Sequence, residues 1–197
     1  MQMLSKVIKL DLHYSSEQSH LYQRQTCYLA PFPDESAEHL AKRLLCYLTL
    51  FELQPQWARQ AHSGKKPDLY LHDQQQHFLL WCQVDLPNEK GLLRASHQSD
   101  HVVLVGDEAE FPKVKALCKG LTNVSFLAFT TLQIETCCQM FKGHMQLSMW
   151  RDECQLLITD GQQQLELSLN EAICHGRLGL SHASPSMAAA AQICARH

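Results

Sequence analysis

Three oxygen-bearing side chains stand where two short strands are expected to lie side by side. Asp68 begins the first strand, and Gln83 and Asp85 stand at the end of the second. Because strand side chains alternate with a period of two, Gln83 and Asp85 are expected to share a face. Asp68 comes near them if the strands are neighbours. Carboxylate and amide oxygens are ligands that Mg²⁺ accepts, so the pattern predicts a Mg²⁺ site.

Simpler roles explain the same three residues. Asp68 can turn the chain after Pro67, and the end of the second strand can reach solvent, with Asp85 capping a helix that begins near Asn88. Polar groups on an otherwise apolar strand are costly to bury unless they are paired. This cost favours a pocket over a chance arrangement.

The elements that position these residues follow from hydrophobic periodicity. Residues 67–73 and 78–87 read as the central strand pair, followed by helices and strands in alternation up to a strand at 124–129. Residues 6–14 and 21–29 alternate cleanly and predict an opening hairpin. Asp34 is expected to cap a helix that ends near Phe51. Strands at 145–150, 154–159 and 162–169 follow, the last two joined by a two-residue turn at Asp160-Gly161.

These elements predict an α/β or α+β fold. It consists of a mixed β-sheet, antiparallel at the start and parallel in the middle, flanked by helices, with an N-terminal hairpin and C-terminal antiparallel strands. Residues 1–172 are expected to form one domain, and residues 173–197 a loosely held tail.

Composition narrows the class of protein. The formal net charge of −3 argues against a strongly basic surface, although local basic patches remain open, at Lys65-Lys66 and at Lys113, Lys115 and Lys119. Nine cysteines without a CxxC pair predict reduced thiols in a cytoplasmic protein, and Cys137-Cys138 is read as adjacent core cysteines on a helix. No apolar run is long enough to predict a membrane span.

Two stretches resemble the bacterial YaeQ family. One is residues 33–38 running into Arg43, and the other is residues 80–90 running into Arg94-Ala95. The resemblance continues in register to about Ala172. It implies a fold like that of the PD-(D/E)XK restriction-endonuclease-like nucleases, which bind Mg²⁺ with acidic residues and use a lysine to orient the attacking water.

The resemblance assigns roles by position. Asp68 stands where the nuclease-like acid belongs, Gln83 where the family has Glu, and Asp85 where nucleases have Lys and this family usually has Gly. Glu35 and Glu38 match acids of the first helix that can approach the metal, and Glu38 is the preferred candidate. Charge complementarity with the helix dipole explains both acids equally well.

Lys90 and Arg94 match basic positions of the family and can replace the missing lysine. Because they are four residues apart on a helix, they share a face and can form a phosphate-binding pair. A solvated helix face is the simpler explanation.

Two functions remain open. In the favoured one, Gln83 and Asp85 differ from the residues that nucleases have at these positions and leave a weakened metal site. The protein then binds nucleic acid or a protein of the transcription or repair machinery, without strong catalysis. In the alternative, the protein is a Mg²⁺-dependent nuclease or phosphodiesterase. Asp68 and Asp85 would hold the ion, and Lys90 or Arg94 would orient the water.

Overall fold

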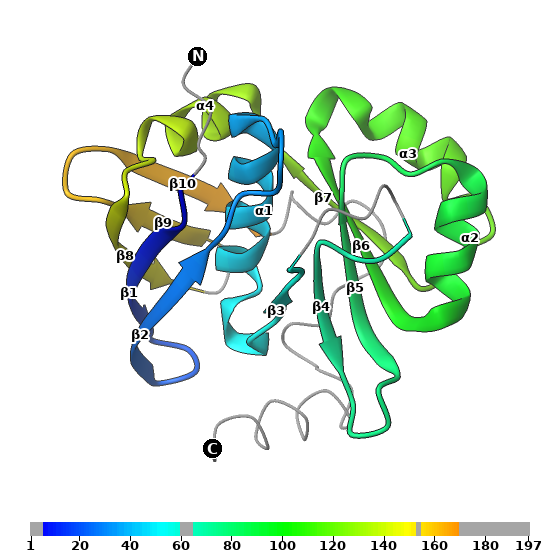
Figure 1. Ribbon diagram of the computed structural model, residues 1–197, viewed down its shortest axis with the longest axis horizontal. Helices are drawn as coiled ribbons and strands as arrows, with labels where there is room; N and C mark the ends of the chain where they lie inside the picture. The colour runs from blue at the N-terminus through cyan, green and yellow to red at the C-terminus, as the bar shows by residue number, and fades with distance from the viewer. Residues whose placement is uncertain (1–5, 60–64, 153–154, 170–197) are drawn as a thin grey trace.

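The computed structural model describes residues 6–59, 65–152 and 155–169. Across these ranges the strands form two mixed five-stranded sheets (Figure 1). The N-terminal sheet has the order β10-β9-β8-β1-β2, and the central sheet has the order β3-β4-β5-β6-β7. The predicted mixed α/β class is confirmed, but the single sheet that the sequence suggested is divided in two. The PD-(D/E)XK core stays a prediction.

The elements have the following bounds. The N-terminal sheet contains β1 (Ile8–Ser16), β2 (Leu21–Leu29), β8 (His144–Arg151), β9 (Gln155–Thr159) and β10 (Gln164–Ser168). The central sheet contains β3 (Gln56–Trp57), β4 (Leu69–His72), β5 (Phe78–Val84), β6 (Ser99–Asp107) and β7 (Val124–Phe129). The helices are α1 (Ala37–Thr49), α2 (Glu89–Gln98), α3 (Phe111–Leu117) and α4 (Thr131–Gln139), with short 3-10 turns η1 (Phe51–Leu53) and η2 (Glu108–Glu110).

Strand β1 is the central link of the N-terminal sheet, because it pairs with β8 and not with a strand of the central sheet. As predicted, its apolar residues alternate, and Ile8, Leu10, Leu12 and Tyr14 are all buried. Strand β1 pairs with β2 in antiparallel and with β8 in parallel orientation. The opening hairpin therefore joins the C-terminal strands, a long-range pairing that alternation within each strand does not specify.

Helix α1 lies between the two sheets and forms the middle of the main core (Figure 1). Its residues from Leu40 onward are buried almost without interruption, because both sheets direct apolar side chains at it. The predicted cap was wrong. Ser36, rather than Asp34, accepts a hydrogen bond from the backbone N–H of His39, while Asp34 adopts a left-handed conformation with φ of 59°.

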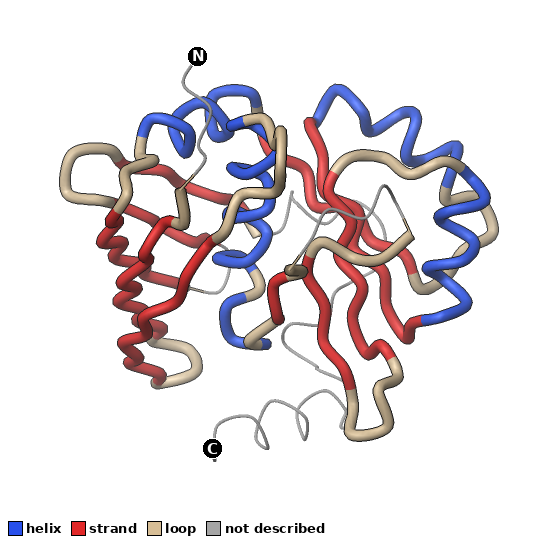
Figure 2. The backbone as a smooth tube through the Cα atoms, viewed as in Figure 1, coloured by secondary structure: helices blue, strands red, loops and turns tan. Residues whose placement is uncertain are grey.

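The central sheet has the predicted connections. Strands β4 and β5 form an antiparallel pair, while β5, β6 and β7 run parallel and are joined through α2 and α3. Both helices cover the face of these strands that points away from α1 (Figure 2). They close a second apolar cluster that includes Trp81, Leu92 and Val114.

The remaining predictions concern the C-terminal half. Strands β9 and β10 form the predicted hairpin, but residues 160–163 connect them, so the two-residue turn was wrong. The side chain of Asp160 accepts hydrogen bonds from the backbone N–H groups of Gln162 and Gln163, which stabilises the longer loop. Cys137 and Cys138 lie on α4 as expected, the first buried and the second half-buried. The tail at 173–197 lies outside the described residues.

Among the helices of the described ranges, none combines the length and the apolar character that crossing a membrane requires.

Candidate functional site

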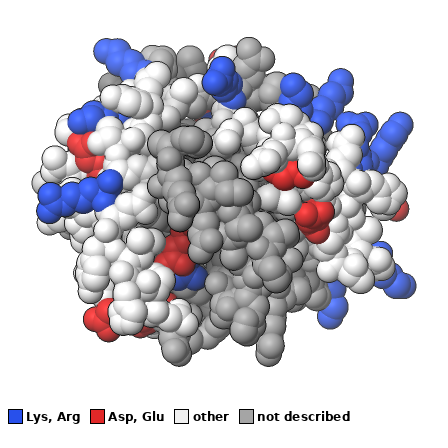
Figure 3. Space-filling view, turned by 90° about the horizontal axis from the view of Figure 1, so that it is seen from below, with Lys and Arg blue, Asp and Glu red and all other residues white. Residues whose placement is uncertain are grey.

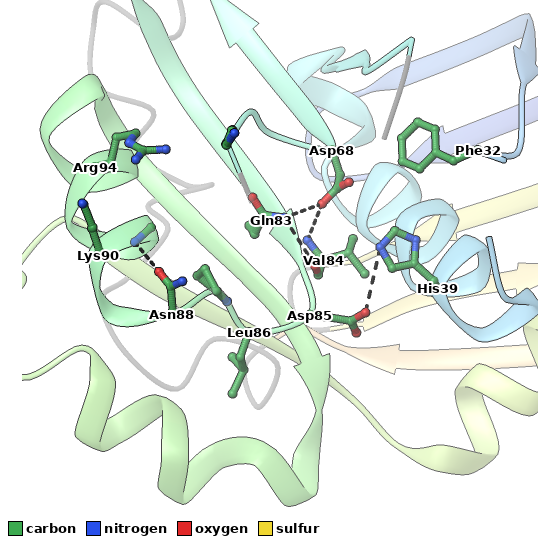
Figure 4. Close-up of a pocket in the computed structure, with 13 residues that line it drawn as sticks. Phe32, His39, Asp68, Gln83, Val84, Asp85, Leu86, Asn88, Lys90 and Arg94 are labelled. Carbon is green, nitrogen blue, oxygen red and sulfur yellow. Dashed lines mark hydrogen bonds and ion pairs between the residues drawn. The ribbon is translucent and has the colours of Figure 1, made fainter. Parts of the chain in front are cut away.

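Asp68 and Gln83 meet at the end of the central strand pair, as the sequence predicted. The backbone N–H of Asp68 donates to the carbonyl of Cys82 at 2.8 Å, which fixes Asp68 beside β5. Its carboxylate oxygen Oδ2 accepts hydrogen bonds from the backbone N–H of Val84 at 2.8 Å and from Nε2 of Gln83 at 3.0 Å (Figure 4). Asp68 and Gln83 are only 6% and 8% exposed, so the hydrogen bond between them is buried.

Asp85 lies beside this pair but points in another direction. Strand β5 ends at Val84, and Asp85 adopts a left-handed conformation with φ of 61°, so the expected alternation stops before it. Its carboxylate turns toward α1, where Oδ1 lies 2.8 Å from Nζ of Lys42 and Oδ2 lies 3.9 Å from Nε2 of His39 (Figure 4). Gln83 and Asp85 therefore border one cavity without sharing a strand face.

Of the two acids that the sequence suggested, Glu35, just before α1, contacts Phe32 and His39 of the cavity wall without bordering the cavity itself. Both of its carboxylate oxygens accept hydrogen bonds from Nη1 of Arg43, at 2.9 and 2.8 Å, and one of them also accepts from the backbone N–H of Phe32. The side chains of Glu35 and Arg43 are 2% and 1% exposed, so this is a buried ion pair. Glu38, the acid that the sequence favoured, is exposed and lies outside the residues that border the cavity.

Sequence reasoning missed Arg43 and His39 as partners of Glu35. Nδ1 of His39 contacts the Glu35 carboxylate, and the guanidinium carbon of Arg43 lies 3.7 Å from the centre of the Phe32 ring. Their spacing could have indicated this contact. Residues 35, 39 and 43 are four apart, so they lie on one face of the helix and of the turn that precedes it.

The cavity between α1 and α2 has a volume of about 480 Å³. Asp68, Gln83 and Asp85 border it, and so do the cations Lys65, Lys90 and Arg94. Lys90 and Arg94 stand on α2, across the cavity from His39 (Figure 4). Asn88 caps α2 by accepting a hydrogen bond from the backbone N–H of Gly91 at 2.8 Å. The positive end of the α2 dipole therefore faces the same space.

The two buried carboxylates have opposite electrostatic environments. Burial raises the pKa of Asp68, and the hydrogen bond from Val84 N–H offsets only part of this effect. Burial also opposes ionisation of Glu35, but the hydrogen bond with His39 and the charge of Arg43 outweigh it and lower the pKa of Glu35. The carboxylate with the best charge compensation is therefore Glu35, which lies deep beside α1.

The arrangement of these groups does not fit the ligand set that a Mg²⁺ ion needs. Gln83 presents its amide N–H, not its oxygen, to Asp68, and Asp85 is held by Lys42. Within the described ranges, no three His, Cys, Asp or Glu side chains are grouped closely enough to hold one ion. The cavity instead combines carboxylates that have protein partners with the cations Lys65, Lys90 and Arg94, which form no ion pair with any described residue.

The raised pKa of Asp68 gives a testable pH dependence. Ionisation of a carboxyl whose folded-state pKa is raised costs stability, so the contribution of Asp68 is full below the ordinary value of 3.8 and is lost as pH rises through its folded-state pKa. The D68N variant stays neutral. Its free energy of unfolding, measured by urea titration, should rise relative to wild type as pH increases above about 4.

The E35Q variant is the control for this experiment because the sign is reversed. A lowered pKa contributes stability above the ordinary value of 4.5 that disappears as pH falls, so the deficit of E35Q should shrink toward acidic pH. Parallel pH profiles for D68N and wild type would contradict the assigned environment of Asp68.

Comparison with known proteins shows one consistent relationship. The profile described as "YaeQ protein" matches residues 1–169 of the chain. A relative from Salmonella typhi, named "Uncharacterized protein YaeQ", is 21% identical over 146 residues, which cover 72% of this chain and 81% of the relative.

Two crystal structures share the fold. The YaeQ protein from Xanthomonas axonopodis pv. citri matches with a TM-score of 0.75 and 18% identity, covering 87% of this chain and 99% of that chain. The YaeQ protein from Pseudomonas syringae matches with a TM-score of 0.74 and 22% identity, covering 85% of this chain and 95% of that chain. The match of the family profile to residues 1–169 establishes that the chain belongs to the YaeQ family.

Proposed function

We propose that the protein binds the phosphate backbone of nucleic acid at the cavity between α1 and α2, without metal-dependent cleavage. One observation carries this proposal: Lys65, Lys90 and Arg94 border the cavity without an ion-pair partner among the described residues. The carboxylates beside them are already engaged within the protein. An anionic ligand therefore meets attraction there with little competition from nearby acids.

The three cations suit phosphate in complementary ways. A guanidinium such as that of Arg94 presents a planar set of donors that binds two phosphate oxygens at once. The ammonium groups of Lys65 and Lys90 act as point charges, and the amino end of α2 adds a favourable dipole. Figure 3 shows Lys and Arg side chains gathered at its right-hand edge, on the side where Figure 1 places α2 and α3. The weakly negative net charge therefore coexists with a basic region.

Salt dependence tests the proposal. Fluorescence anisotropy of a labelled oligonucleotide, titrated with protein between about 50 and 200 mM KCl, should give an association constant that falls linearly with salt on a logarithmic plot. With two or three phosphates neutralised, the slope should lie at roughly −1.4 to −2.7. Undetectable binding at low salt, or a slope near zero, would contradict a phosphate-binding role.

The nuclease alternative is tested on the same oligonucleotides. We expect single-stranded and duplex DNA and RNA to remain intact after incubation with the protein and Mg²⁺ or Mn²⁺. We also expect calorimetry to show no micromolar binding of Mg²⁺. Metal-dependent cleavage that Asp68→Ala abolishes, or Mg²⁺ binding that Asp85→Asn abolishes, would replace the present proposal with a catalytic one.

A further inference from the structure

A second cavity adjoins the phosphate-binding one. It also has a volume of about 480 Å³, and its walls include the aromatic side chains Tyr70, His72, Phe78 and Trp81. Lys65 borders both cavities. The two cavities therefore meet at this lysine, and what binds in one is close to what binds in the other.

Strand alternation explains why aromatic side chains collect there. In β4, Leu69 and Leu71 point into the main core, so Tyr70 points to the opposite face, where it pairs across the strands with Trp81 of β5. Trp81 is buried and packs with α2, whereas Tyr70 and Phe78 are half-buried. The ring centres of Phe78 and Trp81 are 5.0 Å apart, and those of Tyr70 and Phe78 are 6.0 Å apart. The result is a partly open aromatic surface that rests on the buried ring of Trp81.

Helix α2 connects the two cavities along its length. It contributes Lys90 and Arg94 to the first cavity and Gln98 to the second. Eight residues of α-helix extend about 12 Å, so cationic and aromatic surfaces follow each other along one helix. We call the two joined cavities the α2 groove.

The charges of the second cavity match an anionic ligand. Arg59, Lys65 and Lys66 border it, all exposed, and they form no ion pair within the described part of the chain. Of the described residues around this cavity, none is an Asp or a Glu. An apolar peptide would leave these cations without a partner, whereas a strand of nucleotides offers both a ring to stack and a charge to pair.

From this arrangement we infer that the α2 groove binds single-stranded nucleic acid. An unpaired base stacks on Tyr70 in the second cavity and meets the perpendicular ring of Phe78 at its edge, and the adjoining phosphates contact Lys65 and Arg94. Aromatic surfaces next to a basic groove are the usual means of holding single strands, because every base has a face to stack. A duplex keeps its bases stacked on one another and makes only the phosphate contacts. The inference rests on the proposed function and specifies which form of nucleic acid that site prefers.

The test compares two strands that differ only in their bases. Anisotropy titrations at fixed salt use a labelled oligothymidylate and an abasic strand of the same length. Wild-type protein should bind the oligothymidylate more tightly, and Tyr70→Leu should weaken that binding about fivefold or more while leaving the abasic strand unaffected. Leucine preserves apolar packing, and Phe78→Leu repeats the test if Tyr70→Leu lowers the melting temperature.

Tyr22→Leu is the matched control, because Tyr22 is a strand tyrosine on the other sheet and is 76% exposed. Equal binding of both strands by wild type, or a Tyr70→Leu variant that retains full affinity, overturns the inference. Loss of affinity in Tyr22→Leu instead of Tyr70→Leu also overturns it, because the bases would then lie on the other sheet. The K90E/R94E variant should weaken both strands, and its failure to do so would count against the proposed function separately.

Discussion

Reversing the two cations of α2, in the variant K90E/R94E, is expected to lower the affinity for single-stranded nucleic acid by roughly 100-fold or more. Each charged hydrogen bond to phosphate contributes about 1.5–3 kcal/mol, so the loss of two such bonds costs at least about 3 kcal/mol. The slope of the salt dependence should also become shallower by about 1.4 to 1.8, since two fewer phosphates are neutralised. Anisotropy titrations over a range of KCl concentrations measure both effects.

The matched control is K113E/K115E. Lys113 and Lys115 are exposed on α3, carry the same total charge and lie outside both cavities of the α2 groove. If binding depends only on overall charge, both double variants should lose affinity equally. If the groove is the site, K113E/K115E should stay within a few-fold of wild type, and an equal loss would contradict the assignment.

Replacing Arg43 by Ala should destabilise the protein by about 3–5 kcal/mol. Arg43 is fully buried, pairs with the buried carboxylate of Glu35 and covers the Phe32 ring. Its removal deprives the buried carboxylate of Glu35 of the two hydrogen bonds from Nη1 and opens a void beside Phe32. In a protein of this length the melting temperature should fall by about 6–20 °C, which calorimetry or thermal denaturation followed by circular dichroism can measure.

Lys42→Ala provides the comparison, because Lys42 is the neighbouring residue and also pairs with an acid. Its partner Asp85 is 53% exposed, so solvent screens the pair and the loss should stay below about 1 kcal/mol. The double variant E35Q/R43A should be less destabilised than the sum of the single variants, because removing Arg43 matters less once the charge of Glu35 is gone. Strict additivity would show that the two residues do not act as a pair.

Sequence periodicity determined most of the secondary structure. The bounds of β2 and β7 were predicted exactly, since both strands are defined by patterns that persist along the whole element. Thr130 followed three residues later by Gln133 is a local capping-box pattern, and the structure shows both of its hydrogen bonds at the start of α4. These features depend on residues within a few positions of one another, which is why the sequence reveals them.

Errors arose where local signals competed. Asp34 and Ser36 both suit a helix cap, and the left-handed backbone at Asp34 decides in favour of Ser36. Asp160-Gly161 is typical of a two-residue turn, but the register of β9 against β10 requires a longer connection. In each case the position of the flanking elements outweighed the preference of the residue pair.

In the sequence, strand alternation and the neighbouring strand bring Asp68 and Gln83 together, and the resemblance to the YaeQ family adds Lys90 and Arg94, which helix spacing puts on one face. Only the tertiary structure decided which groups are available. It turned Asp85 toward Lys42, buried Glu35 with Arg43 and joined Lys65 to α2 across the cavity. Ion pairs between side chains distant in sequence depend on how α1 packs against the central sheet. That packing pairs Asp85 with Lys42, whereas Lys65, Lys90 and Arg94 border the cavity without an ion-pair partner among the described residues.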